Sequence, residues 1–289
     1  MIQAAPQYTA IRNAMSVDVE DYYQVSAFEK VVNRDDWATM PSRVERNVDR
    51  ILELFDTAGT KATFFTLGML AERHPDMVRR IHAQGHELAS HGWSHVRVTQ
   101  QQPAEFSEDI RRTKQTLEDI SGAPVLGYRA ASYSIGASNL WALDELAKAG
   151  YVYSSSIVPI KHDLYGMPEA SRFPFLAADE RLLEIPVSTI PVLGKNINCG
   201  GGGWFRLFPY VFSRWAIHSL NNKEKQSAIF YFHPWEIDPE QPRIHDAPFR
   251  SRFRHYLNLE RMQKRLGALL QDFSWGRVDE VYGLVGDEL

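Results

Sequence analysis

The sequence of 289 residues lacks the features that mark several classes of protein. It contains a single cysteine, Cys199, so no disulfide can form within the chain. Basic residues number 32 against 36 acidic residues, an excess of the wrong sign for binding nucleic acid. No stretch approaches the roughly 18 consecutive apolar residues that a membrane-spanning helix needs. We therefore expect no disulfide framework, no nucleic-acid partner and no membrane span.

The first residues also lack a basic stretch followed by an apolar run, which is the pattern of a secretory signal peptide. We expect a soluble cytoplasmic protein, with a periplasmic or envelope-associated location as the alternative. The composition, 44% hydrophobic and 24% charged, is typical of a globular protein with a large core. It carries no signal for a particular oligomeric state.

Short apolar or β-branched runs alternate with helical patterns along the chain, which is typical of parallel βαβ units. Seven strands are predicted, near residues 15–19, 61–66, 86–90, 124–129, 151–154, 182–187 and 228–232. Apolar residues at helical spacing predict helices within 44–55, 106–120 and 140–147, and one long helix over 249–272. The alternation predicts an α/β fold built on a parallel sheet or barrel.

Ionisable side chains follow several of the predicted strands. Asp18, Glu20 and Asp21 follow the first strand, His91 and His95 the third, Arg129 the fourth and His233 the seventh. The carboxyl ends of parallel strands lie on one face, and α/β proteins build their active sites there. We therefore expect these side chains to form a single site.

Two pairs of histidines have the spacing of metal ligands. In HGWSH, His91 and His95 follow a strand, and one turn can bring both rings onto one face. His82 and His86 have the same spacing, but a glycine between them should end the helix that carries His82. We expect only the first pair to bind a metal, because the second pair should lie on two different elements.

The other charged groups each allow two interpretations. The acidic run of MSVDVEDYY is either a solvated loop or a source of one metal ligand and one free carboxylate. Arg129 ends an apolar strand, and a buried guanidinium needs a carboxylate such as Asp18. His233 could be a hydrogen-bonded core residue, but its place on the same face as the other groups favours a functional role.

Read in order, these stretches resemble the polysaccharide deacetylases of the NodB-homology type, carbohydrate esterase family 4. SVDVED is similar to the first motif of the family, SHGWSH to the histidine motif, YRAASYS to the third motif and FYFHPW to the last. SVDVEDYYQVSAFE, HDLYGMP and FYFHPWEIDPEQPR further resemble the subgroup associated with exopolysaccharide gene clusters and the PEP-CTERM/exosortase system.

The resemblance implies a distorted (β/α)7 barrel of the NodB type in a single domain spanning residues 1–289. Residues 15–235 would form the barrel, and residues 236–289 a C-terminal extension packed on it. The implied activity is hydrolysis of a carbon–nitrogen bond other than a peptide bond. The enzyme would remove acetyl groups from an N-acetylated polysaccharide with the help of a divalent metal, commonly Zn²⁺.

The resemblance also implies roles for individual residues. His91 and His95 would bind the metal together with Glu20 or Asp21, between which the motif does not choose. Asp18 would be the general base, held by Arg129, and His233 the general acid. From the aromatic content we expect substrate contacts from Trp93, Tyr133, Trp204 and Trp235.

The sequence departs from the family pattern at several places. Val19 separates the first two acids, Ala131 stands where the third motif often has proline, and serines at 154–156 replace the acid of the fourth motif. These departures leave open which groups orient the base and His233. The glycine patch at 200–203 could allow a close backbone approach, form a mobile lid or be a plain solvent loop.

Two alternative functions follow from the same residues. One is hydrolysis of other linear or cyclic amides on this scaffold, with or without a metal. The other is non-catalytic binding of polysaccharide by a protein that keeps the fold.

Overall fold

Seven short parallel strands form the centre of the protein, and each overlaps a stretch predicted as a strand. They are β1 (Arg12–Val19), β2 (Thr63–Thr66), β3 (Glu87–Ser90), β4 (Gly127–Tyr128), β5 (Tyr153–Ser154), β7 (Leu182–Glu184) and β10 (Ile229–Phe232). The computed structural model describes residues 11–162 and 165–284. The strands form because their residues are apolar or β-branched and are buried on both faces, as in the run TFFT of β2.

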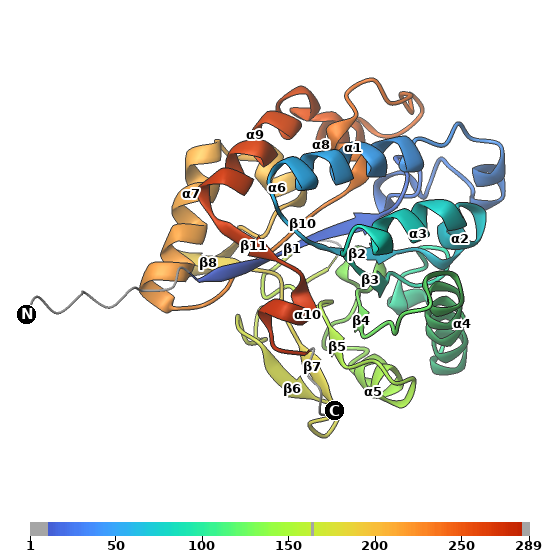
Figure 1. Ribbon diagram of the computed structural model, residues 1–289, viewed down its shortest axis with the longest axis horizontal. Helices are drawn as coiled ribbons and strands as arrows, with labels where there is room; N and C mark the ends of the chain where they lie inside the picture. The colour runs from blue at the N-terminus through green and yellow to red at the C-terminus, as the bar shows by residue number, and fades with distance from the viewer. Residues whose placement is uncertain (1–10, 163–164, 285–289) are drawn as a thin grey trace, which may run out of the picture.

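The strands follow the order β10-β1-β2-β3-β4-β5-β7, and β6 (Phe175–Ala177) adds an antiparallel edge beside β7. The sheet curls as it passes from β10 to β7 (Figure 1). No ladder joins β10 to β7 in the described ranges, so the sheet is an open, barrel-like arrangement. The structure confirms the predicted α/β fold with a distorted parallel barrel.

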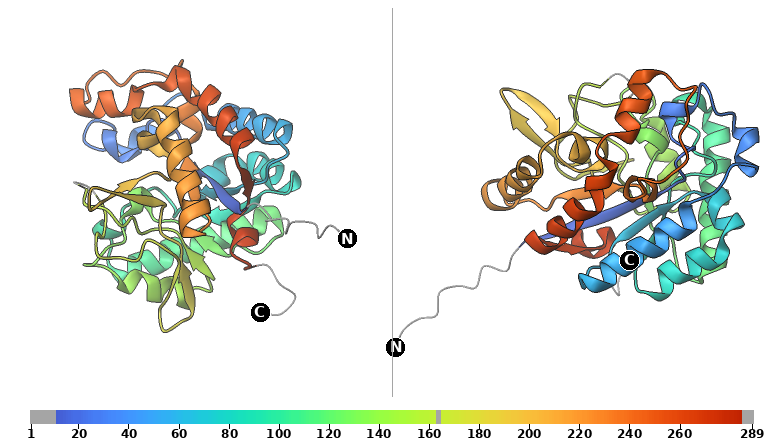
Figure 2. Two further views of the ribbon diagram at one scale, coloured as in Figure 1. Left: turned by 90° about the vertical axis from the view of Figure 1, so that its left-hand side faces the viewer. Right: turned by 90° about the horizontal axis from the view of Figure 1, so that it is seen from above.

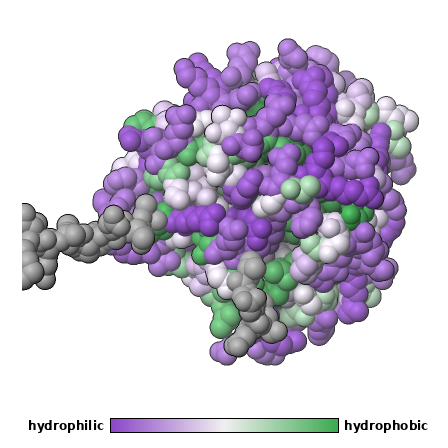
Figure 3. All heavy atoms as spheres, in the orientation of Figure 1, coloured by the Kyte–Doolittle hydropathy of each residue, from purple (hydrophilic) through white to green (hydrophobic). Residues whose placement is uncertain are grey.

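Helices cover the outside of the sheet (Figure 2). Those that connect the first strands are α1 (Val44–Thr57), α2 (Gly68–Arg73), α3 (Pro75–Ala83), α4 (Pro103–Ser121) and α5 (Trp141–Lys148). In α1, Val48, Ile51 and Phe55 lie on one side and are fully buried against the sheet. In the view of Figure 3 the surface is mostly hydrophilic, with hydrophobic residues in small separate patches.

The prediction of one long helix over 249–272 is wrong. The segment forms α8 (Phe249–Tyr256) and α9 (Leu259–Asp272), which are separated at Asn258, a residue with a left-handed φ of 54°. The buried Arg206 donates hydrogen bonds to the carbonyls of His255 and Leu257. These carbonyls turn toward a side chain instead of continuing a helical ladder, so the helix is interrupted there.

The glycine patch lies between strand β9 (Lys195–Asn198) and helix α6 (Gly202–Leu207), and it is neither a solvent loop nor a lid. Gly201 forms a parallel bridge with Tyr231 of β10 and has a φ of 117°. A Cβ atom there would lie 2.0 Å from the Tyr231 carbonyl oxygen. The close backbone approach that glycine allows is therefore an approach to the protein's own strand.

The C-terminal segment returns to the first strand. Strand β11 (Ser274–Gly276) pairs with the start of β1, and helix α10 (Val278–Val281) packs below the amino ends of the strands. The sequence analysis missed β11 and three other short strands, β6, β8 (Thr189–Val192) and β9. Among the described helices, none has the length and apolar character needed to cross a bilayer.

Candidate active site

The carboxyl ends of β1 and β4 bring Asp18 and Arg129 together. Arg129 Nη1 donates to Asp18 Oδ1 at 2.5 Å, and both side chains are buried. Arg129 also donates to Ser16 Oγ and to the carbonyl and hydroxyl of Ser155. Because the guanidinium is paired and fully hydrogen-bonded, it holds the carboxylate of Asp18 in one orientation.

Next to Asp18, three side chains converge as a candidate metal centre. Glu20, His91 and His95 each present a ligand atom, and these atoms lie within 4.8 Å of one another. His91 Nδ1 lies 2.9 Å from the carbonyl oxygen of Arg129, which fixes the orientation of the ring. His95 has a φ of 53°, so a left-handed residue turns this ring back toward His91.

The donor set fits a divalent metal ion. Glu20 Oε2 is buried and receives no aligned hydrogen bond, although His95 Nε2 lies only 2.9 Å away. Burial favours the neutral form of Glu20, but the charges of His95 and His233 outweigh it and lower the pKa of Glu20 to about 2. Burial lowers the pKa of His91 to about 4. An ionised carboxylate and a neutral imidazole are the forms that bind metals.

Asp21, the alternative to Glu20, lies elsewhere. Its Oδ2 accepts hydrogen bonds from Ser42 Oγ and from the backbone N–H groups of Arg43 and Val44. These groups stand at the start of α1, so Asp21 caps that helix. Strand β1 ends at Val19, and beyond it the two carboxylates contact different parts of the protein.

His233 follows β10 and faces both acids. Its Nε2 lies 3.4 Å from Glu20 Oε1 and 3.9 Å from Asp18 Oδ2. Its Nδ1 lies 2.6 Å from Glu236 Oε1, and Glu236 Oε2 accepts from Arg206 Nε at 2.5 Å. Burial disfavours the charged imidazole, but Glu20 and Glu236 raise the pKa of His233 to about 9.

The sequence analysis missed this chain of contacts from His233 to Arg206. Glu236 and Arg206 are both buried, and Arg206 lies 30 residues before Glu236, on α6. The signal in the sequence was the acid three residues after the histidine in HPWE, which fits a cap on the short helix at Pro234–Ile237. Glu236 is therefore the acid that contacts Nδ1 of His233 in this structure.

The serines at 155 and 156 stabilise Arg129, the partner of Asp18, and the residue that follows it. Ser155 binds Arg129, and Ser156 Oγ accepts the backbone N–H of Ala130 at 2.9 Å. Glu184 Oε1 accepts the N–H groups of Ser156 and Ile157, each at 2.8 Å. The loop after β5 is thus tied to both β4 and β7.

Two of the four expected substrate residues lie at the site. The hydroxyl of Tyr133 is 3.4 Å from Asp18 Oδ2. Trp235 is buried, donates from Nε1 to Glu20 Oε1 at 3.3 Å, and stacks between the rings of His233 and His255. Trp235 therefore positions other site residues and offers no open face to a sugar.

The other two lie away from the cluster. The ring of Trp93 stacks with the guanidinium of Arg112 in α4, 3.3 Å from its centre, and the substrate contact expected from it stays a prediction. Trp204 of α6 lines a separate cavity together with Tyr231. The histidines at 82 and 86 also behave as expected: His86 is buried, and its Nδ1 accepts the N–H of Ala62.

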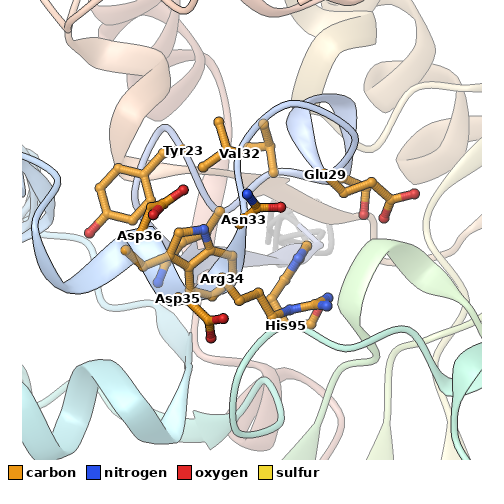
Figure 4. Close-up of a pocket in the computed structure, with 12 residues that line it drawn as sticks. Tyr23, Glu29, Val32, Asn33, Arg34, Asp35, Asp36 and His95 are labelled. Atoms are coloured by element: carbon orange, nitrogen blue, oxygen red, sulfur yellow. The ribbon is translucent and has the colours of Figure 1, made fainter.

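A cavity of about 390 Å³ opens directly beside His95 (Figure 4). Most of its lining comes from the segment between β1 and α1 and includes Tyr23, Asn33, Asp36 and Trp37. The exposed side chains of Asn33 and Asp36 can contact the hydroxyl groups of a sugar, whereas the rings of Tyr23 and Trp37 are almost completely buried. The sequence analysis did not single out this segment, because its side chains meet only after the loop folds back on itself.

Comparison with known proteins agrees with these motifs. A family model described as polysaccharide deacetylase matches residues 34–154, and one described as a domain of unknown function, DUF3473, matches residues 155–283. A peptidoglycan-N-acetylglucosamine deacetylase from Listeria monocytogenes is 33% identical over 72 residues, which are 25% of this chain and 16% of that protein. The chain thus matches a small part of this relative's length.

Two solved structures share the fold. A candidate polysaccharide deacetylase from Mycobacterium smegmatis superposes with a TM-score of 0.61 at 19% identity, covering 98% of this chain and 93% of that one. An allantoinase superposes with a TM-score of 0.60 at 14% identity, covering 96% and 90%. The fold alone is therefore compatible with different amide substrates. Residues 34–154 of this chain are therefore similar to the polysaccharide deacetylase family, and residues 155–283 to the domain of unknown function DUF3473.

Proposed function

We propose that the protein is a metal-dependent hydrolase that removes acetyl groups from an N-acetylated sugar polymer. The observation that carries this proposal is the convergence of Glu20, His91 and His95 beside an Asp18–Arg129 pair and His233. A ligand triad, a buried acid and a histidine are the groups that hydrolysis of an amide requires. We further propose Zn²⁺ as the metal and an exopolysaccharide as the polymer, the latter on the resemblance of SVDVEDYYQVSAFE and FYFHPWEIDPEQPR.

Each of these residues would have a separate role in the reaction. A divalent cation bound by Glu20, His91 and His95 would polarise the acetamide carbonyl and make water more acidic. Asp18, held by Arg129, would accept the proton of the attacking water. The backbone N–H groups near Ala130 to Ser132 would contribute to holding the developing oxyanion. Of these, the N–H of Ala130 already donates to a serine hydroxyl, which leaves the two that follow it.

His233 would complete the reaction. Its Nε2 faces the same space as the two acids, and Glu236 holds the opposite ring nitrogen. It would donate a proton to the sugar nitrogen as the carbon–nitrogen bond breaks, a step that typically accelerates a reaction by about 10²–10⁴-fold. Acetate and a free amino sugar would leave. Tyr133 and the cavity beside His95 would hold the reacting sugar and its neighbour.

Acetate release from an N-acetylated chito-oligosaccharide tests the proposal. We expect activity in the zinc-loaded protein, loss of activity on chelation, recovery when Zn²⁺ is added back, and a loss of at least about 100-fold in Asp18→Asn. Asp179→Asn, between β6 and β7 with a side chain that is 95% exposed, is the control that keeps its metal and most of its turnover. A zinc-loaded protein that releases no acetate from any acetylated glycan would point to the non-catalytic binding function.

The allantoinase-like fold supports a second candidate, the hydrolysis of linear or cyclic small amides. The two candidates differ in the length of the substrate and in whether the reaction needs a bound metal. Turnover of a ureide by the metal-free protein, with none on acetylated oligosaccharides, would favour the small-amide candidate.

A further inference from the structure

Exposed apolar side chains concentrate on one part of the surface. Of the nine large hydrophobic residues exposed among the described residues, five lie on α6, α7 (Tyr210–Ser219) and α8. We define the apolar face as Leu207, Val211, Trp215, Phe249 and Phe253. Phe249 is 75% exposed and Val211 70%. Side chains this apolar seldom gather on a surface that faces only water.

A shared cavity and a row of aromatic contacts link these residues across the three helices. Leu207 of α6 and Phe253 of α8 both line one cavity of about 500 Å³. On α8, the rings of Phe249 and Phe253 stack with centroids 6.2 Å apart. Val211 and Trp215 lie on α7, which follows α6 after Pro209, and a row of aromatic contacts runs from Trp204 through Phe208 and Phe212 to Trp215.

Basic residues are concentrated on and after α8, at one side of the apolar face. Residues 243–265 contain seven arginines and lysines and two acids, although the chain as a whole has more acids than bases. Helix α8 carries three arginines and no acid. The exposed Arg261 stands beside Arg265, whose guanidinium donates to the carbonyls of Phe205 and Phe208. The basic groups therefore border both Leu207 and the two phenylalanines.

We propose that the apolar face docks on an anionic membrane surface. Exposed Phe, Trp and Leu side chains enter the headgroup region, and the arginines beside them attract anionic lipids. A second copy of the chain is a poorer occupant, because a symmetric contact would bring the two basic regions together. The protein would lie on the bilayer without spanning it.

Docking in this way places the candidate active site near the lipid surface. Tyr231 lines the cavity between α6 and α8, and its ring packs against His233 with centroids 5.8 Å apart. Tyr231 thus lies between the cavity at the docked face and His233, the candidate general acid. The proposal goes beyond deacetylation and holds for any chemistry at this site, since it concerns where the protein acts.

Cosedimentation of the zinc-loaded full chain with lipid vesicles tests the proposal. We expect binding to vesicles of phosphatidylcholine mixed with phosphatidylglycerol, at least about tenfold weaker binding to phosphatidylcholine alone, and release by high salt. Phe249→Ser combined with Phe253→Ser should weaken binding by about tenfold or more. Arg261→Gln should weaken it by about fivefold.

The matched control is Leu176→Ser, which removes an apolar side chain of 57% exposure from β6, outside the apolar face. This variant should bind vesicles like the wild type, and thermal unfolding should show that all variants fold. Equal binding to both kinds of vesicle, no binding by the wild type, or an equal loss in the control would overturn the proposal. So would a dimer in lipid-free solution that the double phenylalanine variant dissociates, because the face would then be a contact between copies.

Discussion

Glu20 and Asp21 are neighbours in the chain, yet their carboxylates contact different parts of the protein. Glu20 faces two imidazoles and the indole of Trp235. Asp21 accepts three hydrogen bonds from N–H or O–H groups at the start of α1, and a fourth from the backbone N–H of Tyr22. Burial raises the pKa of Asp21, and its hydrogen bonds oppose the shift. One acid therefore belongs to the site and the other to the scaffold.

Substitution of the two acids should separate these roles. We expect Glu20→Gln to weaken zinc binding by more than about 100-fold, because a neutral amide replaces the charged ligand. Asp21→Ala should keep its zinc and lower the free energy of unfolding by about 1–2 kcal/mol, because helix α1 loses its cap. Metal titration and denaturant unfolding measure the two effects. Loss of zinc in the Asp21 variant at unchanged stability would reverse the assignment.

Glu236 contacts His233 and Arg206, and in the proposed reaction it would act through His233. We expect Glu236→Gln to lower kcat by about 10–100-fold while KM and zinc content stay the same, because the imidazole loses its orienting carboxylate. Glu240→Gln, whose side chain is 80% exposed, is the control and should be neutral. Steady-state kinetics with metal analysis measure the difference, and a change in KM alone would count against a positioning role.

At the scale of elements, the close packing of the glycine patch on β10 determines where α6 begins. Gly201 lies against the Tyr231 carbonyl, which brings Arg206 one turn later to Glu236. Sequence patterns do not report such an approach, since a run of glycines also occurs in flexible loops.

Two glycine substitutions test this packing. Gly201→Ala should lower the free energy of unfolding by at least about 2 kcal/mol, because its Cβ would overlap the Tyr231 carbonyl and its φ is unfavourable. Gly267→Ala, inside α9 with nothing within 4 Å of the added Cβ, should raise it by about 0.5–1 kcal/mol. Urea unfolding of both variants measures the contrast. A tolerated Gly201→Ala would show that the patch can move aside.

At the scale of the whole molecule, a buried acidic cluster joins the C-terminal segment to the amino ends of the strands, opposite the site. Glu87 accepts hydrogen bonds from Thr63, Tyr153 and the N–H of Asp279. Burial, followed by the nearby charge of Asp279, raises the pKa of Glu87 from 4.5 to about 8. The folded protein therefore holds a proton that the unfolded chain releases above pH 4.5.

This proton makes stability depend on pH. The contribution of Glu87 is fully present below pH 4.5 and is lost as the pH rises toward 8, at up to about 1 kcal/mol per pH unit. We expect Glu87→Gln to remove this decline, so that the free energy of unfolding of the variant rises relative to that of the wild type between pH 5 and 8. Urea unfolding across this range measures the difference, and parallel curves would contradict a protonated Glu87.

Much of the fold could be predicted from local patterns. Apolar periodicity predicts the seven parallel strands and three of the helices, α1, α4 and α5. Each strand buries a whole run of apolar residues, and each helix buries one apolar side against the core. Local patterns could not predict the helix break at Asn258 or the short strands, because these features depend on partners such as Arg206 that are distant in the sequence.

For the candidate site, the sequence by itself determined which residue types stand at the ends of the strands, and therefore that Asp18, His91, His95, Arg129 and His233 meet on one face. Only the tertiary structure decided that Glu20 and not Asp21 joins the histidines, and that Glu236 and Arg206 support His233. The physical reason is that the position and the end of each strand are encoded locally, and parallel strands bring their carboxyl ends to one face. The direction of a buried polar side chain depends on the partner that compensates its desolvation, and here those partners come from distant segments.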